Sequence, residues 1–72
     1  MTCVSDDGKP TLSGIRLLHA IRSGKEDPES IAREAELPLY RIRSGLRKML
    51  QFGLVNKIDE GTYRITAKGR EW

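Results

Sequence analysis

Apolar residues recur at helical spacing in three stretches of the chain, and a fourth stretch has the composition of paired strands. The first stretch predicts a helix that begins near Thr11 or Ser13, where a hydroxyl can accept hydrogen bonds from free amides of the first turn. Gly24 can end this helix, because glycine readily adopts the left-handed conformation common after a helix. The side expected to face the core contains Ile15, Leu17, Leu18 and Ile21.

The second stretch opens with Asp27-Pro28-Glu29, which is a strong helix-start signal. Asp27 offers a capping oxygen, Pro28 lacks an amide that the first turn leaves unpaired, and Glu29 lies near the positive end of the helix. Pro38 prevents simple continuation, because its ring would clash with the preceding turn, so we expect a tight turn there. The short helix carries its apolar residues at Ile31, Ala32, Ala35 and Leu37.

The third stretch predicts a helix that runs from Leu39, ends at Gly53 and has two contrasting sides. One side is an apolar stripe formed by Leu39, Ile42, Leu46, Met49 and Leu50. The opposite side is polar and basic, and it contains Tyr40, Arg41, Arg43, Ser44, Arg47, Lys48 and Gln51. Such a helix buries one side and offers the other to solvent or to a partner.

Two short runs of β-branched and apolar residues, 54–59 and 62–66, flank Glu60-Gly61 and predict a β-hairpin. A two-stranded hairpin is marginal in water, so we expect its apolar side to rest on the helices. Candidates for that side are Val55, Ile58, Tyr63 and Ile65. The polar residues 1–10 are typical of a flexible lead-in, which leaves residues 11–72 as the folded domain.

Size and composition argue against catalysis. A chain of 72 residues with 38% hydrophobic residues can form one compact core but no deep substrate cavity. Cys3 and His19 are each the sole residue of their kind, so we expect no disulfide within the chain, no metal site and no cofactor. The lone cysteine, together with the absence of a signal-peptide pattern or a membrane-length apolar run, favours a cytoplasmic protein.

Charge is sorted along the chain by element. Thirteen Lys and Arg against ten Asp and Glu give a net charge of +3. Residues 37–58 contain five bases and no acid, whereas residues 26–36 contain five acids and one base. A basic stretch confined to one helix and the strand after it suits a nucleic-acid partner.

Three helices with a tight turn before the third, followed by a hairpin, form the plan of a winged helix-turn-helix, a mainly α fold with a small β-hairpin (α+β). Particular residues accompany this plan. The segment IAREAELPLYRIRSGLRKMLQFGLV contains Ile-Ala, an alanine three residues on, a leucine before the turn, and Gly-Leu-Val after the third helix. The segment TYRITAKG, at the end of the hairpin, contains an aromatic residue, an apolar residue, Thr and Lys-Gly. In these positions, which span residues 11–69, the chain resembles the MarR-like transcriptional regulators.

The resemblance implies that the third helix is a recognition helix in the DNA major groove and that the hairpin is a wing touching the flanking DNA. Arginine can form two hydrogen bonds to guanine, and both Arg and Lys neutralise phosphates. Carried over residue by residue, the implied contacts are Leu39, Tyr40, Arg41, Arg43, Ser44, Arg47 and Lys48. Because the expected wing tip Asp59-Glu60-Gly61 is acidic, we expect the wing to contribute Lys57, Arg64 and Lys68 at its base.

Two positions depart from the pattern of that family. Glu36 stands where many such turns have glycine, so the turn either tolerates another residue or has a different geometry. Gly45 lies inside the third helix, where glycine costs up to about 1 kcal/mol relative to alanine, and suggests close contact with another backbone.

Several alternatives to DNA binding stay open. The basic side is also compatible with a solvated surface or with RNA binding. A protein-interaction winged helix would instead use an aromatic surface formed by Phe52, Tyr63 and Trp72. A homodimer and a larger protein assembly are both compatible with the sequence.

Overall fold

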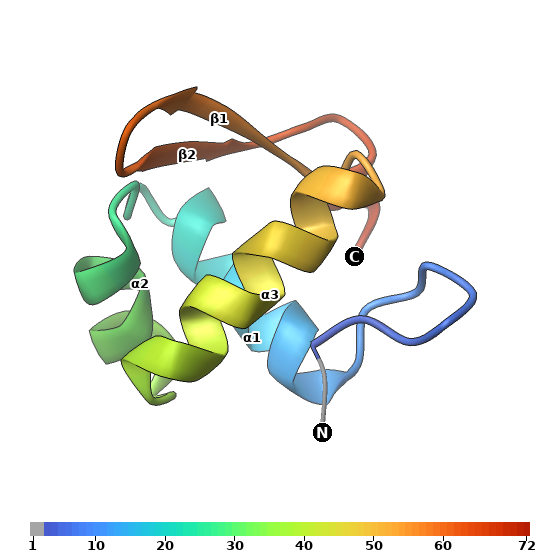
Figure 1. Ribbon diagram of the computed structural model, residues 1–72, viewed down its shortest axis with the longest axis horizontal. Helices are drawn as coiled ribbons and strands as arrows, with labels where there is room; N and C mark the ends of the chain where they lie inside the picture. Colours follow the sequence, from blue (N-terminus) through green and yellow to red (C-terminus); the bar gives the residue numbers. More distant parts are fainter. Residues whose placement is uncertain (1–2) are drawn as a thin grey trace.

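Three helices are followed by an antiparallel hairpin in the computed structural model, which describes residues 3–72 (Figure 1). The helices are α1 (Leu12–Arg22), α2 (Pro28–Ala35) and α3 (Leu39–Gln51). The strands are β1 (Val55–Asp59) and β2 (Thr62–Ile65), and a short 3-10 helix, η1 (Gly69–Glu71), comes last. This order confirms the expected α+β architecture of three helices and a two-stranded wing.

The first two helices begin at the residues that the sequence signals. Thr11 caps α1 by accepting a hydrogen bond from the Gly14 amide. Asp27 caps α2 by accepting one from the Ser30 amide at 3.0 Å. The hydrogen bonds from Ser30 favour the ionised carboxyl and therefore hold the pKa of Asp27 below its usual 3.8.

The turn between α2 and α3 adopts a left-handed conformation at a non-glycine residue. Glu36 has φ 58° and ψ 43°, and the Leu37 amide donates a hydrogen bond to the Ala32 carbonyl at 3.0 Å. This bond closes the end of α2. The turn thus tolerates Glu36, whose Oε1 also lies 3.2 Å from Arg16 Nη2 on α1.

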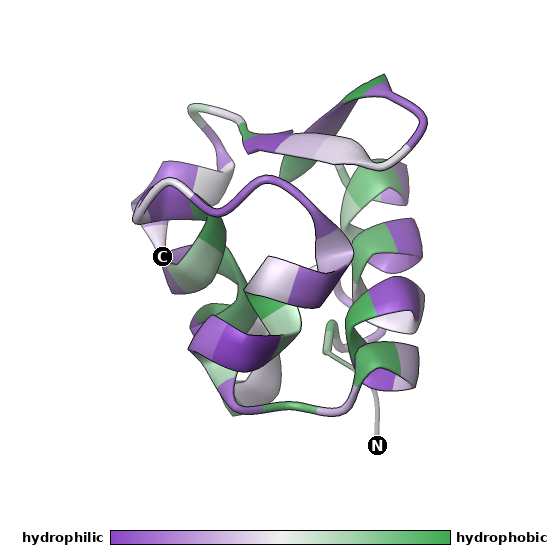
Figure 2. Cartoon of the chain, turned by 90° about the vertical axis from the view of Figure 1, so that its left-hand side faces the viewer, coloured by the Kyte–Doolittle hydropathy of each residue, from purple (hydrophilic) through white to green (hydrophobic). Residues whose placement is uncertain are grey.

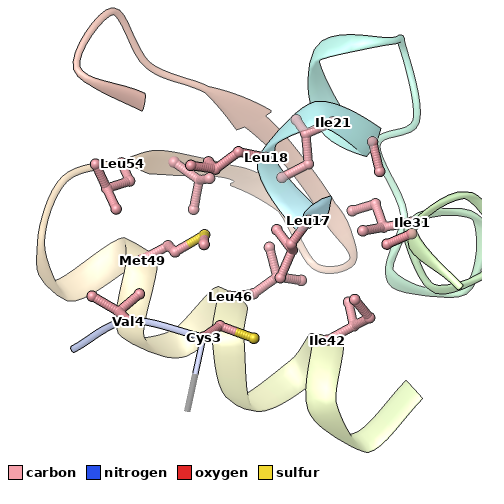
Figure 3. Packing of buried hydrophobic residues seen from close by; sticks show 13 residues of the cluster. Cys3, Val4, Leu17, Leu18, Ile21, Ile31, Ile42, Leu46, Met49 and Leu54 are labelled. Atoms are coloured by element: carbon pink, nitrogen blue, oxygen red, sulfur yellow. The ribbon is translucent and has the colours of Figure 1, made fainter. Parts of the chain in front are cut away.

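The core lies between the three helices and the first strand. Figure 3 shows side chains of α1, α2 and α3 meeting there, together with Leu54 from the start of the hairpin. The most deeply buried residues are Leu17, Leu18, Ile31, Ile42, Leu46, Met49, Leu54 and Val55. The predicted stripe of α3 is confirmed at its three central positions, while Leu39 and Leu50 at its ends are half-buried. Within the described residues, no helix has the length and apolar content needed to span a membrane.

Residues 3–10 differ most from the sequence-based expectation. Cys3 and Val4 are each only 3% exposed and belong to the core (Figure 3). The Thr11 amide donates a hydrogen bond to the Cys3 carbonyl at 2.9 Å, and Val4 pairs with Pro10, so the segment folds back on itself. We call residues 3–10 the N-terminal brace. The structure differs from the expectation of a flexible lead-in over these residues, because two of their side chains are buried among the helices. Residues 1 and 2 of the expected lead-in lie outside the described residues.

Two helical glycines make room for the brace. A side chain at Gly14 would collide with the Cys3 carbonyl, and one at Gly45 would lie 2.8 Å from Cys3 Sγ and 2.9 Å from Leu17 Cδ1. The sequence suggests another backbone as the neighbour of Gly45, but the neighbours are these two side chains. The Cys3 thiol donates to the Arg41 carbonyl with Sγ and O 3.8 Å apart, and burial raises the pKa of this thiol.

The hairpin packs on the helices through one side only. Val55 is opposite Ile65 and Lys57 is opposite Tyr63, but the register shifts between Lys57 and Asp59. Val55 is buried, Tyr63 and Ile65 are half-buried, and Ile58 is 52% exposed. The expectation for Ile58 is wrong, because this residue lies at the register shift, where it has no opposite residue on β2 and its side chain is exposed.

Candidate nucleic-acid interface

One side of α3 is a continuous polar surface that faces solvent. Figure 2 shows the hydrophobic positions of this helix toward the other elements and the hydrophilic positions outward. Arg41 is half-buried, and the other polar side chains of the predicted set are exposed. We call this surface the α3 face, and it consists of Tyr40, Arg41, Arg43, Ser44, Arg47 and Lys48. Leu39, also predicted as a contact, is half-buried at the start of the helix.

The four bases of the α3 face have no acidic partner within the described residues. α3 itself contains no Asp or Glu. Their positive charges are therefore uncompensated locally, and they raise the electrostatic potential over one side of one helix. Within residues 3–72 no acceptor engages the guanidinium and ammonium groups of these four side chains, so their donors are open to a partner.

The remaining members of the α3 face are hydroxyl donors. Tyr40 is 72% exposed in the first turn of α3, and Ser44 follows one helical turn later on the same side. Both hydroxyl groups can donate to phosphate oxygens or to base edges. Because Tyr40 is exposed, its ring and hydroxyl group are open to solvent and contribute little to the core.

The three bases predicted at the base of the wing are engaged within the chain. We call Lys57, Arg64 and Lys68 the wing-base cations. Arg64 Nε donates to Glu26 Oε2 at 3.0 Å, and Lys57 Nζ lies 3.6 Å from Glu60 Oε1. Lys68 Nζ donates to the Phe52 carbonyl at 3.0 Å. The structure thus separates the predicted site residues into an available set on α3 and an occupied set on the wing.

The tip of the wing is acidic and exposed. The Glu60 side chain is 98% exposed, and Asp59 beside it is also exposed. Lys57 offsets one of these two negative charges, so the tip keeps a net negative charge. A tip of this charge is repelled by phosphates.

No protein-family model and no curated protein matches this chain. What the α3 face can do must therefore be argued from its own geometry and charge. Within residues 3–72, His, Cys, Asp and Glu side chains are nowhere grouped in threes as a metal site would require.

The three aromatic residues of the alternative protein-binding surface lie against different elements. Phe52 is half-buried beneath the brace, where a side chain added at Gly8 would lie 3.1 Å from its ring. Tyr63 is half-buried on β2. Trp72 is 40% exposed, and its carbonyl lies 3.4 Å from His19 Nε2 of α1. This alternative therefore has less exposed aromatic surface than the sequence suggests.

Sequence reasoning also missed a pair of bases that the fold brings together. Arg22 of α1 and Arg70 of η1 line one hollow together with residues of β2. They are far apart along the chain and share no motif, so only the folded arrangement could have revealed them.

Proposed function

We propose that the protein binds double-stranded DNA by placing α3 in the major groove, as a small transcriptional regulator. The observation that carries this proposal is the α3 face, in which four bases without acidic partners and two hydroxyl donors share the solvent side of one helix. Positive charge of this kind supplies most of the affinity of proteins for the phosphate backbone.

The dimensions of α3 suit the groove. Its 13 residues span about 20 Å at 1.5 Å per residue, and the B-DNA major groove, about 12 Å wide, admits one helix. Arg43 and Arg47 are one turn apart, so they point to the same side and can reach neighbouring base edges or phosphates. Arg41 and Lys48 are about two turns apart on one edge of the face, where they can contact phosphates that flank the groove.

The buried side of α3 supports the same role. Ile42, Leu46 and Met49 are each at most 1% exposed, so the helix is held firmly while its other side stays free. A rigidly held helix loses little conformational entropy when it binds. Double-stranded RNA is a poorer fit, because its major groove is too deep and narrow for side chains to read.

The proposal can be tested by fluorescence anisotropy on a labelled DNA duplex across a salt series. Four phosphate contacts predict a slope of about −3.6 for log K against log salt, or about 150-fold weaker binding between about 50 and 200 mM salt. A flat salt response would contradict the proposal. Equal or tighter binding of an RNA duplex of the same length would assign the face to RNA.

A double variant identifies the contact surface. Arg43→Ala with Arg47→Ala should weaken DNA binding by about 1 to 3 kcal/mol for each residue and lower the slope by about 1 to 2. The matched control is Lys9→Ala with Lys25→Ala, which removes the same charge from exposed positions outside the α3 face. Equal losses in the two variants would show that only net charge matters and would overturn the assignment to α3.

A further inference from the structure

A hollow of about 200 Å³ lies where the end of α1, β2 and η1 meet. It contains no residue of α3. Its lining also includes the apolar residues Ile21 and Ile65 and the aromatic residue Tyr63. An adjoining hollow of about 310 Å³ shares Arg22 with it and extends to His19 and Ser23.

The hollow carries an excess of positive charge. Its charged lining consists of Arg22, Arg64, Arg70 and Glu26. Arg64 is paired with Glu26 at 3.0 Å, which compensates one arginine. Arg22 and Arg70 are exposed and have no carboxylate partner within the described residues. Two arginines that have no carboxylate partner among the described residues therefore line the same small concavity.

Both arginines project from well-anchored backbone. Arg70 follows Gly69, which is buried so closely against Leu54 that a side chain at position 69 would collide with the Leu54 carbonyl. The Arg70 amide also donates to the Thr66 carbonyl at 3.0 Å. Arg22 belongs to the last turn of α1. The backbone positions from which the two arginines extend are thus set by the fold.

The end of α1 contributes little free negative charge to the hollow. The last carbonyls of a helix normally carry partial negative charge, which would repel an anion. Here the amides of Ser23, Gly24 and Lys25 donate to three of these carbonyls at 3.0 to 3.2 Å.

We propose that this hollow binds a small oxyanion, the carboxylate or phosphate group of a metabolite, between Arg22 and Arg70. Planar guanidinium groups form paired, charge-assisted hydrogen bonds with such groups, and an anion between them relieves the repulsion of two like charges. The volume is below the roughly 300 to 1,000 Å³ of pockets for drug-sized ligands, which restricts the occupant to a small molecule.

The test is a titration of the ¹⁵N-labelled full chain, followed by amide chemical shifts, with inorganic phosphate in one series and malonate in another. Chloride keeps the ionic strength constant. We expect saturable shifts at Gly24, Ile65 and Arg70, with either or both anions. Saturation by phosphate alone identifies a phosphate site, and saturation by malonate alone identifies a carboxylate site. Shifts that fail to saturate, or that appear only on α3, would overturn the proposal.

The decisive variant is Arg22→Gln with Arg70→Gln, which keeps the side chains polar at exposed positions. We expect it to weaken the saturable binding at least about tenfold, because each lost charge-assisted hydrogen bond contributes about 1.5 kcal/mol or more. Lys9→Gln with Lys25→Gln is the control of equal charge and should bind as the unaltered chain does. Unchanged binding in the arginine variant would overturn the proposal. DNA binding is measured separately with the α3 variants, so failure of one proposal leaves the other intact.

Discussion

The α3 face and the base of the wing carry positive charge in different ways. On α3 four bases have no partner in the described chain, whereas Lys57, Arg64 and Lys68 each contact an acid or a carbonyl. The carboxylate that pairs with Arg64 comes from a distant segment, since Glu26 precedes α2, whereas the one near Lys57 is Glu60 at the tip of the same hairpin. A basic residue is thus most readily available for a polyanion where the fold leaves it without an internal partner, which a count of charges along the chain does not reveal.

The difference between the two regions is one of degree. The Arg64 and Glu26 side chains are 65% and 45% exposed, and exposed ion pairs contribute only about 0 to 1 kcal/mol. A strongly held phosphate could therefore compete for Arg64. The two regions also differ in how firmly they are anchored, because the central stripe of α3 is buried and the outer side of the wing is not.

The largest expected effect concerns this anchoring. Leu46→Ala in α3 should lower the free energy of unfolding by about 2 to 5 kcal/mol, because it removes a side chain that is 1% exposed and leaves a cavity. Ile58→Ala in the wing should change it by no more than about 0.5 kcal/mol, because Ile58 is 52% exposed. Urea unfolding of both variants measures the two values. Equal losses would mean that the wing is as tightly packed as α3.

A smaller effect is expected when the wing-base cations are released. Glu26→Gln with Glu60→Gln removes the carboxylates that pair with Arg64 and Lys57. If the ion pairs keep these two bases from contacting phosphates, their removal should raise the affinity for DNA. The slope of log K against log salt should then steepen by up to about 1.8. The salt titration used for the unaltered chain measures the change.

The control for this experiment removes two negative charges elsewhere, through Asp6→Asn with Glu34→Gln, at exposed positions without an ion pair in the described residues. An identical salt slope in both double variants would show that the wing base does not reach DNA even when its bases are free.

The smallest effect is expected on acidification, in the loop that ties the wing to α2. Asp27 has a folded-state pKa below 3.8, so its capping contribution is fully present above that value and is lost as the pH falls through the folded pKa. Unfolding followed by circular dichroism should show this loss. Asp27→Asn keeps an acceptor oxygen without titrating and should flatten this part of the pH profile. A profile unchanged by the substitution would rule out Asp27 as the source.

Local signals predicted the elements of the fold well. The capping signals act through the backbone of their own turn, so a few adjacent residues are enough to predict their effect; these signals are Thr11, Asp27-Pro28 and Gly53. The buried stripe of α3 was also predictable, because helical periodicity is strong in Ile42, Leu46 and Met49. The six polar members of the α3 face follow from the same periodicity.

Long-range pairings could not be predicted in this way. The burial of Cys3 depends on Gly14 and Gly45, which lie on two different helices. Glycine inside a helix was the available signal, but it does not say which segment comes close. The pairing of Arg64 with Glu26 likewise depends on where the loop before α2 meets β2, and the Tyr63 amide donates there to the Glu26 carbonyl at 2.8 Å. The local sequence pattern of the loop before α2, or of β2, does not predict that the two segments come into contact.

The buried thiol of Cys3 can be used to measure how often the brace opens. Cys3 is 3% exposed, and its raised pKa keeps the sulfur in the unreactive thiol form. An alkylating reagent can therefore reach it only in the moments when the brace leaves the helices. The rate of labelling, compared with that of a free thiol, gives the fraction of time spent open. Because the thiol touches the backbone of α3 at Arg41, that rate also reports how steadily the helix is held.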